Sequence, residues 1–234
     1  IIFVEKLQKN YSKLKIFKHR KNRGFGRNLN DAVKKSKGDL VVILNNDIRP
    51  HKNYIKNSLK HFKDPKVIGV TFAELGNENY ARFFWKQGYL QFEKGHSDKV
   101  HISGWLNGGS SIIRKDLFQK LGGFDQIYAP FYFEDSDLAL RYRQLGYQIK
   151  SVDIQHEHLR GVSADKVYGN RLHAIQSINQ SRFFSRWGNY LKNRKTHHKI
   201  LLNLYSVGWG DVWNCLPSIF TLLRDHPQAT IEIE

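Results

Sequence analysis

Apolar runs and helically spaced apolar positions follow one another along the first third of the chain, which predicts strands and helices in alternation. The run from Leu40 to Leu44 is apolar at every position, as is typical of a buried parallel strand. Alternation of this kind predicts a three-layer α/β domain, with helices on the faces of a sheet. The predicted strands are 14–17, 40–44 and 67–72, and the predicted helices are 1–10, 28–37 and 54–62.

The rest of the chain is less regular and then becomes helical. Residues 74–100 are rich in aromatic side chains and have weak periodicity. A helix from Asp135 to Gly146 and a strand from Gln148 to about His156 are predicted next. Beyond them the pattern is mainly helical. We therefore predict two domains, an α/β domain over residues 1–165 and a helical C-terminal region over residues 166–234.

Composition and charge narrow the class of protein. A hydrophobic content of 40% over 234 residues is enough for a substantial core, so we expect no extensive disorder. The formal net charge of +17 favours polyanionic partners, which include nucleic acid, anionic lipid headgroups and diphosphate-bearing substrates. The single cysteine, Cys215, excludes an internal disulfide and a cysteine-based zinc site. We find no signal-peptide pattern and no apolar stretch of transmembrane length. Because the sequence contains no methionine, we expect a fragment of a longer protein.

Two acidic clusters carry the most chemical information. Asn45-Asn46-Asp47 directly follows the predicted strand at 40–44. Open α/β sheets bind ligands in a crevice at the carboxyl ends of their strands, which is where these residues would lie. Glu134-Asp135-Ser136-Asp137 opens a predicted helix, and adjacent acids raise each other's pKa, which suits a general base. The alternatives are a polar loop cap for the first cluster and helix N-capping for the second. An acid that ligates a divalent cation and an acid that takes a proton would together suit group transfer from a phosphate-bearing donor.

Three further features have both a structural and a functional interpretation. Arg141 lies four residues after Asp137, so we expect an ion pair on one face of the helix. Strand alternation puts His156 and His158 on the same face, either as metal ligands or as a histidine pair without a ligand role. Asn22-Arg23-Gly24 resembles a phosphate-cradling turn only loosely, and a plain αL turn is the alternative.

Short motifs follow one another in a fixed order over residues 1–165. They are Asn22-x-Gly24-Phe25, Asn30, Asn45-Asn46-Asp47, Gly108-Gly109, Gly122-Gly123-Phe124-Asp125 and Glu134-Asp135-x-Asp137-Leu138. In this order they resemble a family two inverting glycosyltransferase of the GT-A fold, and in particular the bacterial rhamnosyltransferase-like enzymes of surface-polysaccharide assembly. The resemblance implies a three-layer α/β/α sandwich around a Rossmann-like, mostly parallel sheet, with a helical C-terminal appendage. The family's first βα unit has no counterpart here.

The resemblance also assigns roles to individual residues. Asp47 is similar to the last acid of the family's metal-binding motif and would hold Mn²⁺ or Mg²⁺, with His158 as a second ligand and His156 as the alternative. Asp135 is similar to the catalytic base, with Glu134 beside it. The donor would contact Asn22, Gly24, Asn30, Asn45, Asn46 and Asp47, and the acceptor would contact Trp105, Asn107, Gly108 and Glu134.

The implied reaction is a single displacement at the anomeric carbon of a nucleotide-sugar donor. The implied acceptor is a saccharide or a lipid-diphosphate-linked saccharide, at or near the inner face of the cell membrane in the cytoplasm. Basic residues at 182–199 precede the Trp-rich apolar segment at 200–223, which suits an anionic membrane surface. A helical subdomain packed on the core, or a dimer interface, is the alternative for residues 182–223.

Other classes of protein remain as alternatives. The net charge permits a nucleic-acid-binding protein, but no reader motif is present and the two acidic clusters would be unexplained, so we do not expect nucleic acid as a partner. A truncated, non-catalytic subunit related to the transferases is a second alternative. A nucleotidyltransferase, which shares the use of a metal, is a third.

Overall fold

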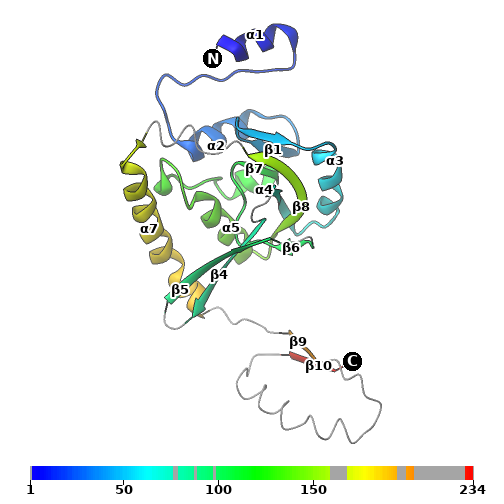
Figure 1. Ribbon diagram of the computed structural model, residues 1–234, viewed down its shortest axis with the longest axis vertical. Coiled ribbons are helices and arrows are strands. Elements are labelled where there is room, and N and C mark those ends of the chain that lie inside the picture. The colour runs from blue at the N-terminus through cyan, green and yellow to red at the C-terminus, as the bar shows by residue number, and fades with distance from the viewer. Residues whose placement is uncertain are drawn as a thin grey trace, which may run out of the picture. The chain divides into compact units, whose positions relative to one another are not determined.

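The computed structural model describes residues 2–75, 79–86, 89–96, 99–158, 168–193, 199–202 and 230–233 (Figure 1). The chain forms two compact units, Ile1–Gly188 and Asn189–Glu234. In the second unit, β9 (Lys199–Leu202) and β10 (Thr230–Ile233) pair in parallel. The helical pattern after residue 165 did not predict these two strands.

A six-stranded mixed sheet forms the centre of the first unit. Three of its strands run in one direction: β1 (Leu40–Leu44), β3 (Val67–Glu74) and β8 (Gln148–His158). The other three run in the opposite direction: β2 (Ile48–Pro50), β6 (His101–Ile102) and β7 (Ser110–Arg114). The order is β1-β7-β3-β8-β2, and β6 also pairs with β8. A separate antiparallel hairpin comprises β4 (Tyr80–Lys86) and β5 (Tyr89–Gly95).

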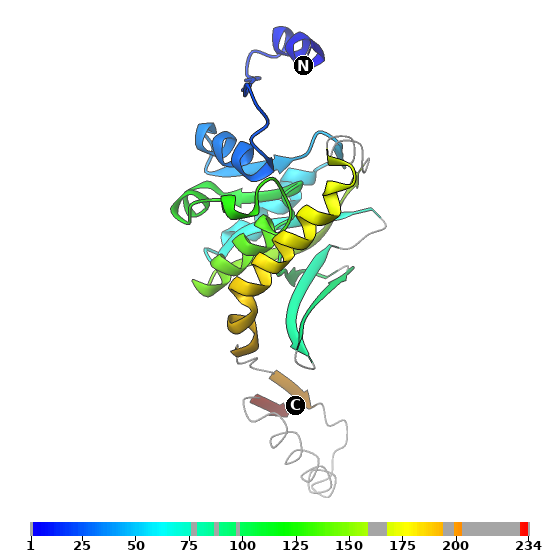
Figure 2. The ribbon, with the colours of Figure 1, turned by 90° about the vertical axis from the view of Figure 1, so that its left-hand side faces the viewer.

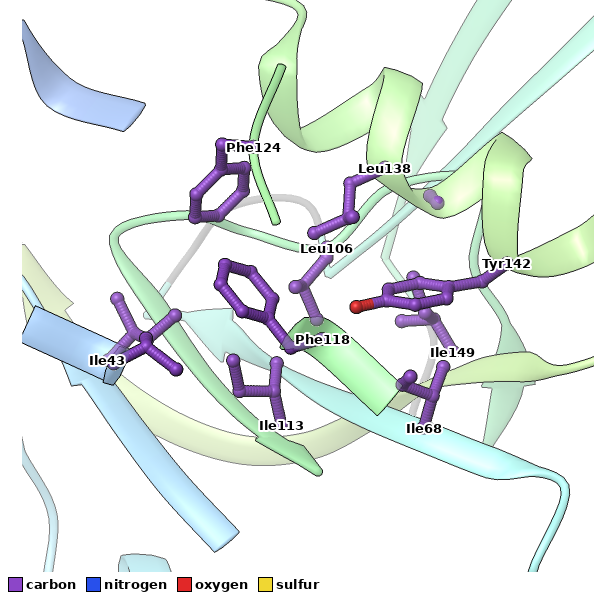
Figure 3. Close-up of a cluster of buried hydrophobic side chains, with 11 residues drawn as sticks. Ile43, Ile68, Leu106, Ile113, Phe118, Phe124, Leu138, Tyr142 and Ile149 are labelled. Carbon is purple, nitrogen blue, oxygen red and sulfur yellow. The ribbon is translucent and has the colours of Figure 1, made fainter. Parts of the chain in front are cut away.

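Helices cover both faces of this sheet, so the predicted three-layer α/β fold is confirmed. One apolar cluster joins α2 (Phe25–Lys35), α4 (Lys115–Lys120) and α5 (Glu134–Gln144) to one face, and Figure 3 shows its side chains. A second cluster joins α3 (Tyr54–Ser58) and the 3₁₀ helix η1 (Leu59–Lys63) to the other face. The remaining helices are α1 (Ile2–Asn10), η2 (Gln126–Tyr128) and α7 (Arg171–Asn193).

The strand β1 differs from the buried parallel strand that its composition predicts. It pairs antiparallel with β7 and lies at one end of the strand order. Val41 and Ile43 pack into the cluster on one face, and Leu40 and Val42 pack into the cluster on the other. Leu40 to Ile43 are therefore apolar because both faces of the strand are covered, and not because parallel strands flank it, whereas Leu44 is exposed.

The strand predicted at 14–17 does not form, and this prediction is wrong. The backbone N–H of Leu14 donates to the carbonyl of Tyr11 and closes a turn. The ring of Phe17 lies under the ammonium group of Lys35 on α2, 4.1 Å from it. A strand needs backbone partners, and the structure gives this segment none among the described strands.

The helix α7 packs against α5 and the β4–β5 hairpin in both ribbon views (Figures 1 and 2). Phe183 stacks between Phe83 of β4 and Phe133, which precedes α5, and both Phe183 and Trp187 are buried. These two aromatic side chains are therefore not available for the membrane contact predicted for residues 182–223. Most of that segment lies outside the described residues. No helix in the described part is long and apolar enough to cross a membrane.

Candidate functional site

Asp47 and His158 meet where β1 ends. Asp47 follows β1 in a turn, in which the Ile48 N–H donates a hydrogen bond to the Asn45 carbonyl over 3.2 Å. Ile48 begins β2, and the antiparallel register of β2 and β8 places Ile48 opposite His158. The Asp47 Oδ2 and His158 Nε2 atoms are therefore 3.4 Å apart, although the residues are distant in sequence.

The oxygen and nitrogen atoms of this pair fit a divalent cation. Asp47 Oδ1 is buried and has no hydrogen-bond partner among the described residues. About a quarter of each side chain is exposed, so the pair is reachable from solvent. No group of three His, Cys, Asp or Glu side chains in the described part of the chain could hold a metal. Mg²⁺ sites commonly combine one or two protein ligands with substrate phosphates, and this pair fits that pattern.

Glu74, at the end of β3, contacts the other nitrogen of the same imidazole. Its Oε2 lies 3.5 Å from His158 Nδ1. A carboxylate on Nδ1 favours the tautomer that keeps the proton there, which leaves Nε2 free to face Asp47. The sequence analysis missed Glu74. In the sequence it is only a single acid shortly after the apolar strand predicted at 67–72, and nothing there connects it to His158.

His156 occupies a different environment from His158. It is fully buried, its Nδ1 lies 3.4 Å from the hydroxyl of Ser110, and the ring of Tyr54 meets it edge to face. Burial lowers the pKa of His156, so the neutral imidazole is favoured. The geometry therefore favours His158 over His156 as the partner of Asp47.

A loop before β7 connects the Asp47 side of the site to α5. The Asn45 N–H donates to the Gly109 carbonyl over 2.8 Å, and the Asn107 side chain accepts from the Gly109 N–H over 2.9 Å. A Cβ at Gly109 would lie 2.7 Å from the side-chain nitrogen of Asn45, so a larger residue there would displace the Asn45 side chain. Asn46 is exposed beside this contact. Asn45, assigned to the donor, and Asn107, assigned to the acceptor, thus both contact Gly109.

Glu134 and Asp135 begin α5 next to that loop. Asp135 Oδ1 accepts hydrogen bonds from the Ser136 N–H at 2.7 Å and from the Ser136 hydroxyl at 3.3 Å. The Gly108 N–H also faces the Asp135 carboxylate and lowers its pKa. Glu134 is only 6% exposed, and its Oε2 has no hydrogen-bond partner in the described part of the structure. Asp135 is partly exposed and is therefore the carboxylate that an acceptor can reach.

The environment keeps a proton on this pair at a higher pH than usual. Burial raises the pKa of Glu134 to about 8, and the charge of Asp135 adds to the rise. Burial also raises the pKa of Asp135, although hydrogen bonds from Ser136 and Gly108 and the charge of Lys94 oppose this. A carboxylate whose pKa moves toward neutrality is a more effective general base at physiological pH.

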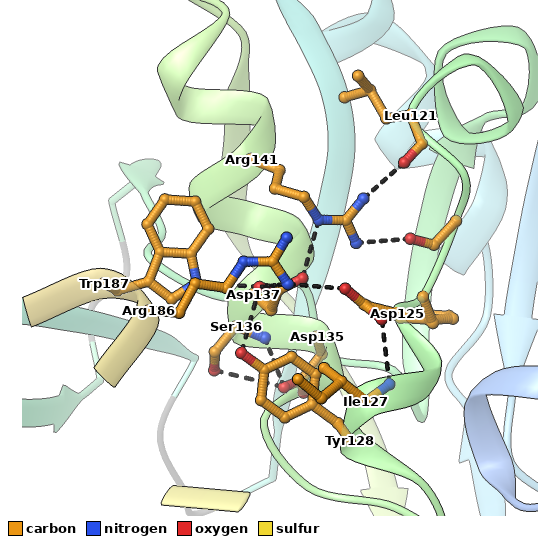
Figure 4. Close-up of polar contacts among 12 residues, drawn as sticks. Leu121, Asp125, Ile127, Tyr128, Asp135, Ser136, Asp137, Arg141, Arg186 and Trp187 are labelled. Atoms are coloured by element: carbon orange, nitrogen blue, oxygen red, sulfur yellow. Dashed lines mark hydrogen bonds and ion pairs between the residues drawn. The ribbon is translucent and has the colours of Figure 1, made fainter. Parts of the chain in front are cut away.

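Asp137 points away from Asp135, as Figure 4 shows. It is fully buried, and its Oδ2 accepts from Arg141 Nε over 2.8 Å, which confirms the predicted ion pair. Its Oδ1 accepts from Trp187 Nε1 at 2.9 Å and lies 3.2 Å from Arg186 Nη1. Asp137 is therefore a structural anchor of α5, and only the first two acids of the motif face the site.

The turn before α2 is held by its own side chains. Asn22 Oδ1 accepts from the Gly24 N–H over 2.9 Å, and the Phe25 N–H donates to the Pro130 carbonyl over 2.8 Å. Gly24 has φ +82° and ψ 166°, which is a glycine conformation but not the αL turn of the alternative interpretation. Both polar atoms of Asn30 are bonded to the backbone of Phe124, at 2.8 and 2.9 Å. Asn22 and Asn30 thus have structural partners, and no contact joins them to Asp47.

Trp105, which the resemblance assigns to the acceptor, lies beside Lys94. The Lys94 ammonium group is 4.8 Å from the centre of the Trp105 ring, and its charge also acts on Asp135. Trp105 Nε1 is buried without a hydrogen-bond partner among the described residues. Lys94 comes from β5, in the aromatic segment whose weak periodicity hid it from sequence analysis.

Comparison with protein families gives one match, to the model described as "Glycosyl transferase family 2", over residues 3–122. No curated protein matches the sequence. Among solved structures, the chain is similar to GalNAc-T7 with UDP, GalNAc and Mn²⁺, with a TM-score of 0.65 and 15% identity. That match covers 82% of this chain and 40% of the other chain.

A second similar structure is the mannosyltransferase PcManGT from Pyrobaculum calidifontis in complex with GDP-Man and Mn²⁺. Its TM-score is 0.50 at 15% identity, and the match covers 96% of this chain and 68% of that one. At such identities the likeness concerns the fold.

Proposed function

Because the chain belongs to glycosyl transferase family 2, we propose that it moves a sugar from a nucleoside-diphosphate donor to an acceptor hydroxyl. The observation that carries the proposal is the meeting of Asp47 and His158 at 3.4 Å, beside the loop whose Gly108 N–H faces Asp135. A cation-binding pair and a base connected by one short loop are what such a transfer requires.

Asp47 and His158 would hold the cation, Mn²⁺ or Mg²⁺. The buried, unpartnered Asp47 Oδ1 and the outward-facing His158 Nε2 supply the ligand atoms. When bound, the cation neutralises charge that grows on the leaving diphosphate. Asn45 and Asn46, which flank this pair, are the residues we propose for contact with the rest of the donor. Both similar structures contain Mn²⁺ together with a nucleotide or nucleotide sugar, which supports the assignment.

Asp135 would act as the base. Its carboxylate takes the proton of the acceptor hydroxyl while that oxygen attacks the anomeric carbon, and the bond from this carbon to the diphosphate oxygen breaks. One attack opposite the leaving group inverts the configuration, and the transition state has oxocarbenium character. Glu134 stays protonated at neutral pH and thereby avoids a second negative charge beside the base.

The acceptor we propose is a saccharide, free or linked through diphosphate to a lipid, in the assembly of a surface polysaccharide of the cell envelope. The net charge of +17 supports an anionic acceptor or membrane surface, and Trp105 with Lys94 above its ring supports saccharide stacking. We propose that the protein works in the cytoplasm, as a peripheral protein at the inner face of the cell membrane.

Differential scanning fluorimetry tests the proposed function. The chain and its Asp47→Ala variant are heated with Mn²⁺ and a panel of UDP-, dTDP- and GDP-sugars. We expect a rise in Tm that needs both the metal and one nucleotide class and is lost in the variant, because a bound ligand stabilises only the folded state. An Asp116→Ala variant, which changes an exposed acid on α4, serves as the control. An equal rise in the Asp47→Ala variant contradicts the donor site, whereas binding without sugar transfer favours a non-catalytic subunit.

A further inference from the structure

The helix α7 contacts the segment that leads into Glu134 and Asp135, although it begins far beyond the last residue of the family match. It also lies beyond residue 165, where the sequence analysis ended the catalytic domain. The contact is made mainly by Asn179, whose side chain is 1% exposed. A buried amide at this position needs hydrogen-bond partners, and its partners show what the helix holds in place.

Asn179 uses both of its polar atoms. Its Nδ2 donates to the carbonyl of Tyr128 over 2.7 Å and to the carbonyl of Phe131 over 2.8 Å. Its Oδ1 accepts from Arg182 Nη1 over 3.0 Å. One side chain therefore bridges two points of the turn that joins η2 to α5.

The turn held by Asn179 ends in an unfavourable backbone conformation. Tyr132 has φ +75° and Phe133 has φ +71°, a region that side chains with a Cβ rarely adopt. Such residues persist only where their surroundings determine them, often at active sites. These two residues directly precede Glu134 and Asp135.

A second contact from α7 supports the same turn. The ring of Phe183 packs against that of Phe133, with centroids 5.3 Å apart, and also against Phe83 of the β4–β5 hairpin at 4.9 Å. Phe183 is fully buried. Asn179 thus holds the backbone of the turn from one side while Phe183 holds the side chain of its last residue.

We propose that Asn179 is a positioning residue that, together with Phe183, fixes the turn 128–133 and so sets where the Asp135 carboxylate lies. The inference rests on the proposed function of Asp135 as the base. If the turn relaxes to ordinary backbone angles, the first residues of α5 move relative to the loop that carries the Gly108 N–H. Asp135 would then lose both its position beside the Gly108 N–H and its alignment with the acceptor hydroxyl.

The test compares Asn179→Ala, Asn179→Asp and Phe183→Leu with the unaltered chain. The Asp variant keeps the size of the side chain but replaces the amide donor with an acceptor. Gln180→Ala, which changes the exposed neighbour on α7, is the matched control. Transfer kinetics give kcat and the KM of the donor, and ¹³C NMR of the labelled carboxylates gives the titration of Asp135. Thermal unfolding shows which variants are folded at the temperature of the assay.

We expect kcat to fall roughly ten- to a hundredfold in the Asn179 variants, because a small misplacement of a reacting group costs about that much. The KM of the donor should stay within about twofold, since Asp47 and His158 are not part of the turn. The titration midpoint of Asp135 should shift, because the Gly108 N–H that faces its carboxylate is displaced. Gln180→Ala should match the unaltered chain in all three measurements.

A folded Asn179→Ala variant with unchanged kcat and an unchanged Asp135 titration overturns the proposal. If that variant does not fold, Phe183→Leu is judged by the same two results. If the unaltered chain transfers no sugar, the proposed function is wrong, but the titration still tests whether Asn179 positions Asp135. A titration midpoint of Asp135 that is the same with and without the Asn179 amide contradicts the positioning role. A shifted midpoint supports that role.

Discussion

The indole nitrogen of Trp187 donates a hydrogen bond to the Oδ1 of Asp137 over 2.9 Å, and so connects α7 to α5. Arg141 completes the environment of this buried carboxylate, since it bonds Asp137 and also the carbonyls of Leu121 and Gly123, each at 2.6 Å. Asp137 thereby ties together α5, α7 and the end of α4 (Figure 4). Asp137, the third acid of the motif, is therefore needed for the fold that positions Glu134 and Asp135.

Replacing Asp137 should therefore destabilise the protein strongly. Asp137→Ala leaves the Trp187 N–H and the Nε–H of Arg141 without the carboxylate that accepts from them, and breaking a buried ion pair costs about 3–5 kcal/mol. Trp187→Phe removes the hydrogen bond to Asp137 but keeps the carboxylate, and should cost about 1–3 kcal/mol. Urea unfolding at neutral pH measures both free energies.

Asp116→Ala is the control for these variants, because this acid is exposed and should change the free energy of unfolding by no more than about 0.5 kcal/mol. A loss in Asp137→Ala no larger than that of Asp116→Ala would contradict the structural role assigned to Asp137.

Local patterns in the sequence were enough to predict the elements that carry the site. The apolar runs located β1, β3 and β8, and the run of acids located the start of α5, because strand and helix periodicity depend on neighbouring residues. The resemblance then brought Asp47, Asp135 and His158 forward as candidates. The ion pair of Asp137 with Arg141 also followed from spacing alone.

Contacts that depend on register or on distant packing could not be predicted in this way. The pairing of Ile48 with His158 places Asp47 against that imidazole, and a register between short strands leaves no mark in either segment. Asn179 is a single polar residue in a helical pattern, and only the carbonyls it bonds reveal its role. Likewise, Leu40 to Ile43 are apolar because they pack on both faces of the sheet, and composition cannot distinguish this from a strand with parallel neighbours.

Glu74 should strengthen the binding of the cation. Its carboxylate orients His158 through Nδ1, and loss of such an outer carboxylate typically weakens metal affinity about 10–100-fold. We expect Glu74→Ala to weaken Mn²⁺ binding by at least about tenfold, and Glu74→Gln, which can still accept from the imidazole, to weaken it less. Electron paramagnetic resonance of free Mn²⁺ in the presence of a bound nucleotide measures the affinity.

The control for Glu74 is Glu157→Gln on the neighbouring strand, where the carboxylate pairs with Arg49 at 3.0 Å. This variant should bind Mn²⁺ as the unaltered chain does. Equal affinity in Glu74→Ala and Glu157→Gln would show that Glu74 does not act through His158.

A methyl group at Gly108 should disturb the base without affecting donor binding. A Cβ there would lie 2.8 Å from the ring of Phe25, so the ring or the loop must shift, and a shift of the loop carries with it the N–H that faces Asp135. We expect Gly108→Ala to lower kcat about tenfold or more, while the nucleotide-dependent rise in Tm is kept.

Gly146→Ala provides the comparison for Gly108→Ala. Gly146 has φ +80°, and a Cβ there would have no heavy atom within 4 Å, so the substitution strains the backbone but is remote from the loop. It should lower stability by about 1 kcal/mol and leave kcat unchanged. If the two alanine variants lose the same fraction of kcat, the effect of Gly108→Ala is one of general stability.

The buried carboxyl of Glu134 should make stability fall as the pH rises through the neutral range. Burial raises its pKa from the ordinary value of 4.5 to about 8, so between these values the folded protein keeps a proton that the unfolded chain has released. The unfolded state binds fewer protons there, and the free energy of unfolding decreases with increasing pH. The full stability is kept below pH 4.5, and the loss is complete once the pH has passed about 8.

Glu134→Gln removes this titration and keeps the shape of the side chain. Thermal unfolding between pH 5 and pH 8.5 should show a Tm that falls by several degrees more in the unaltered chain than in the variant, since one pKa unit corresponds to about 1.4 kcal/mol. Asp116→Asn, an exposed carboxyl replaced by an amide, should follow the unaltered chain. Parallel curves for the unaltered chain and Glu134→Gln would mean that Glu134 is ionised in the folded protein at neutral pH, and Asp135 would then share its site with a second negative charge.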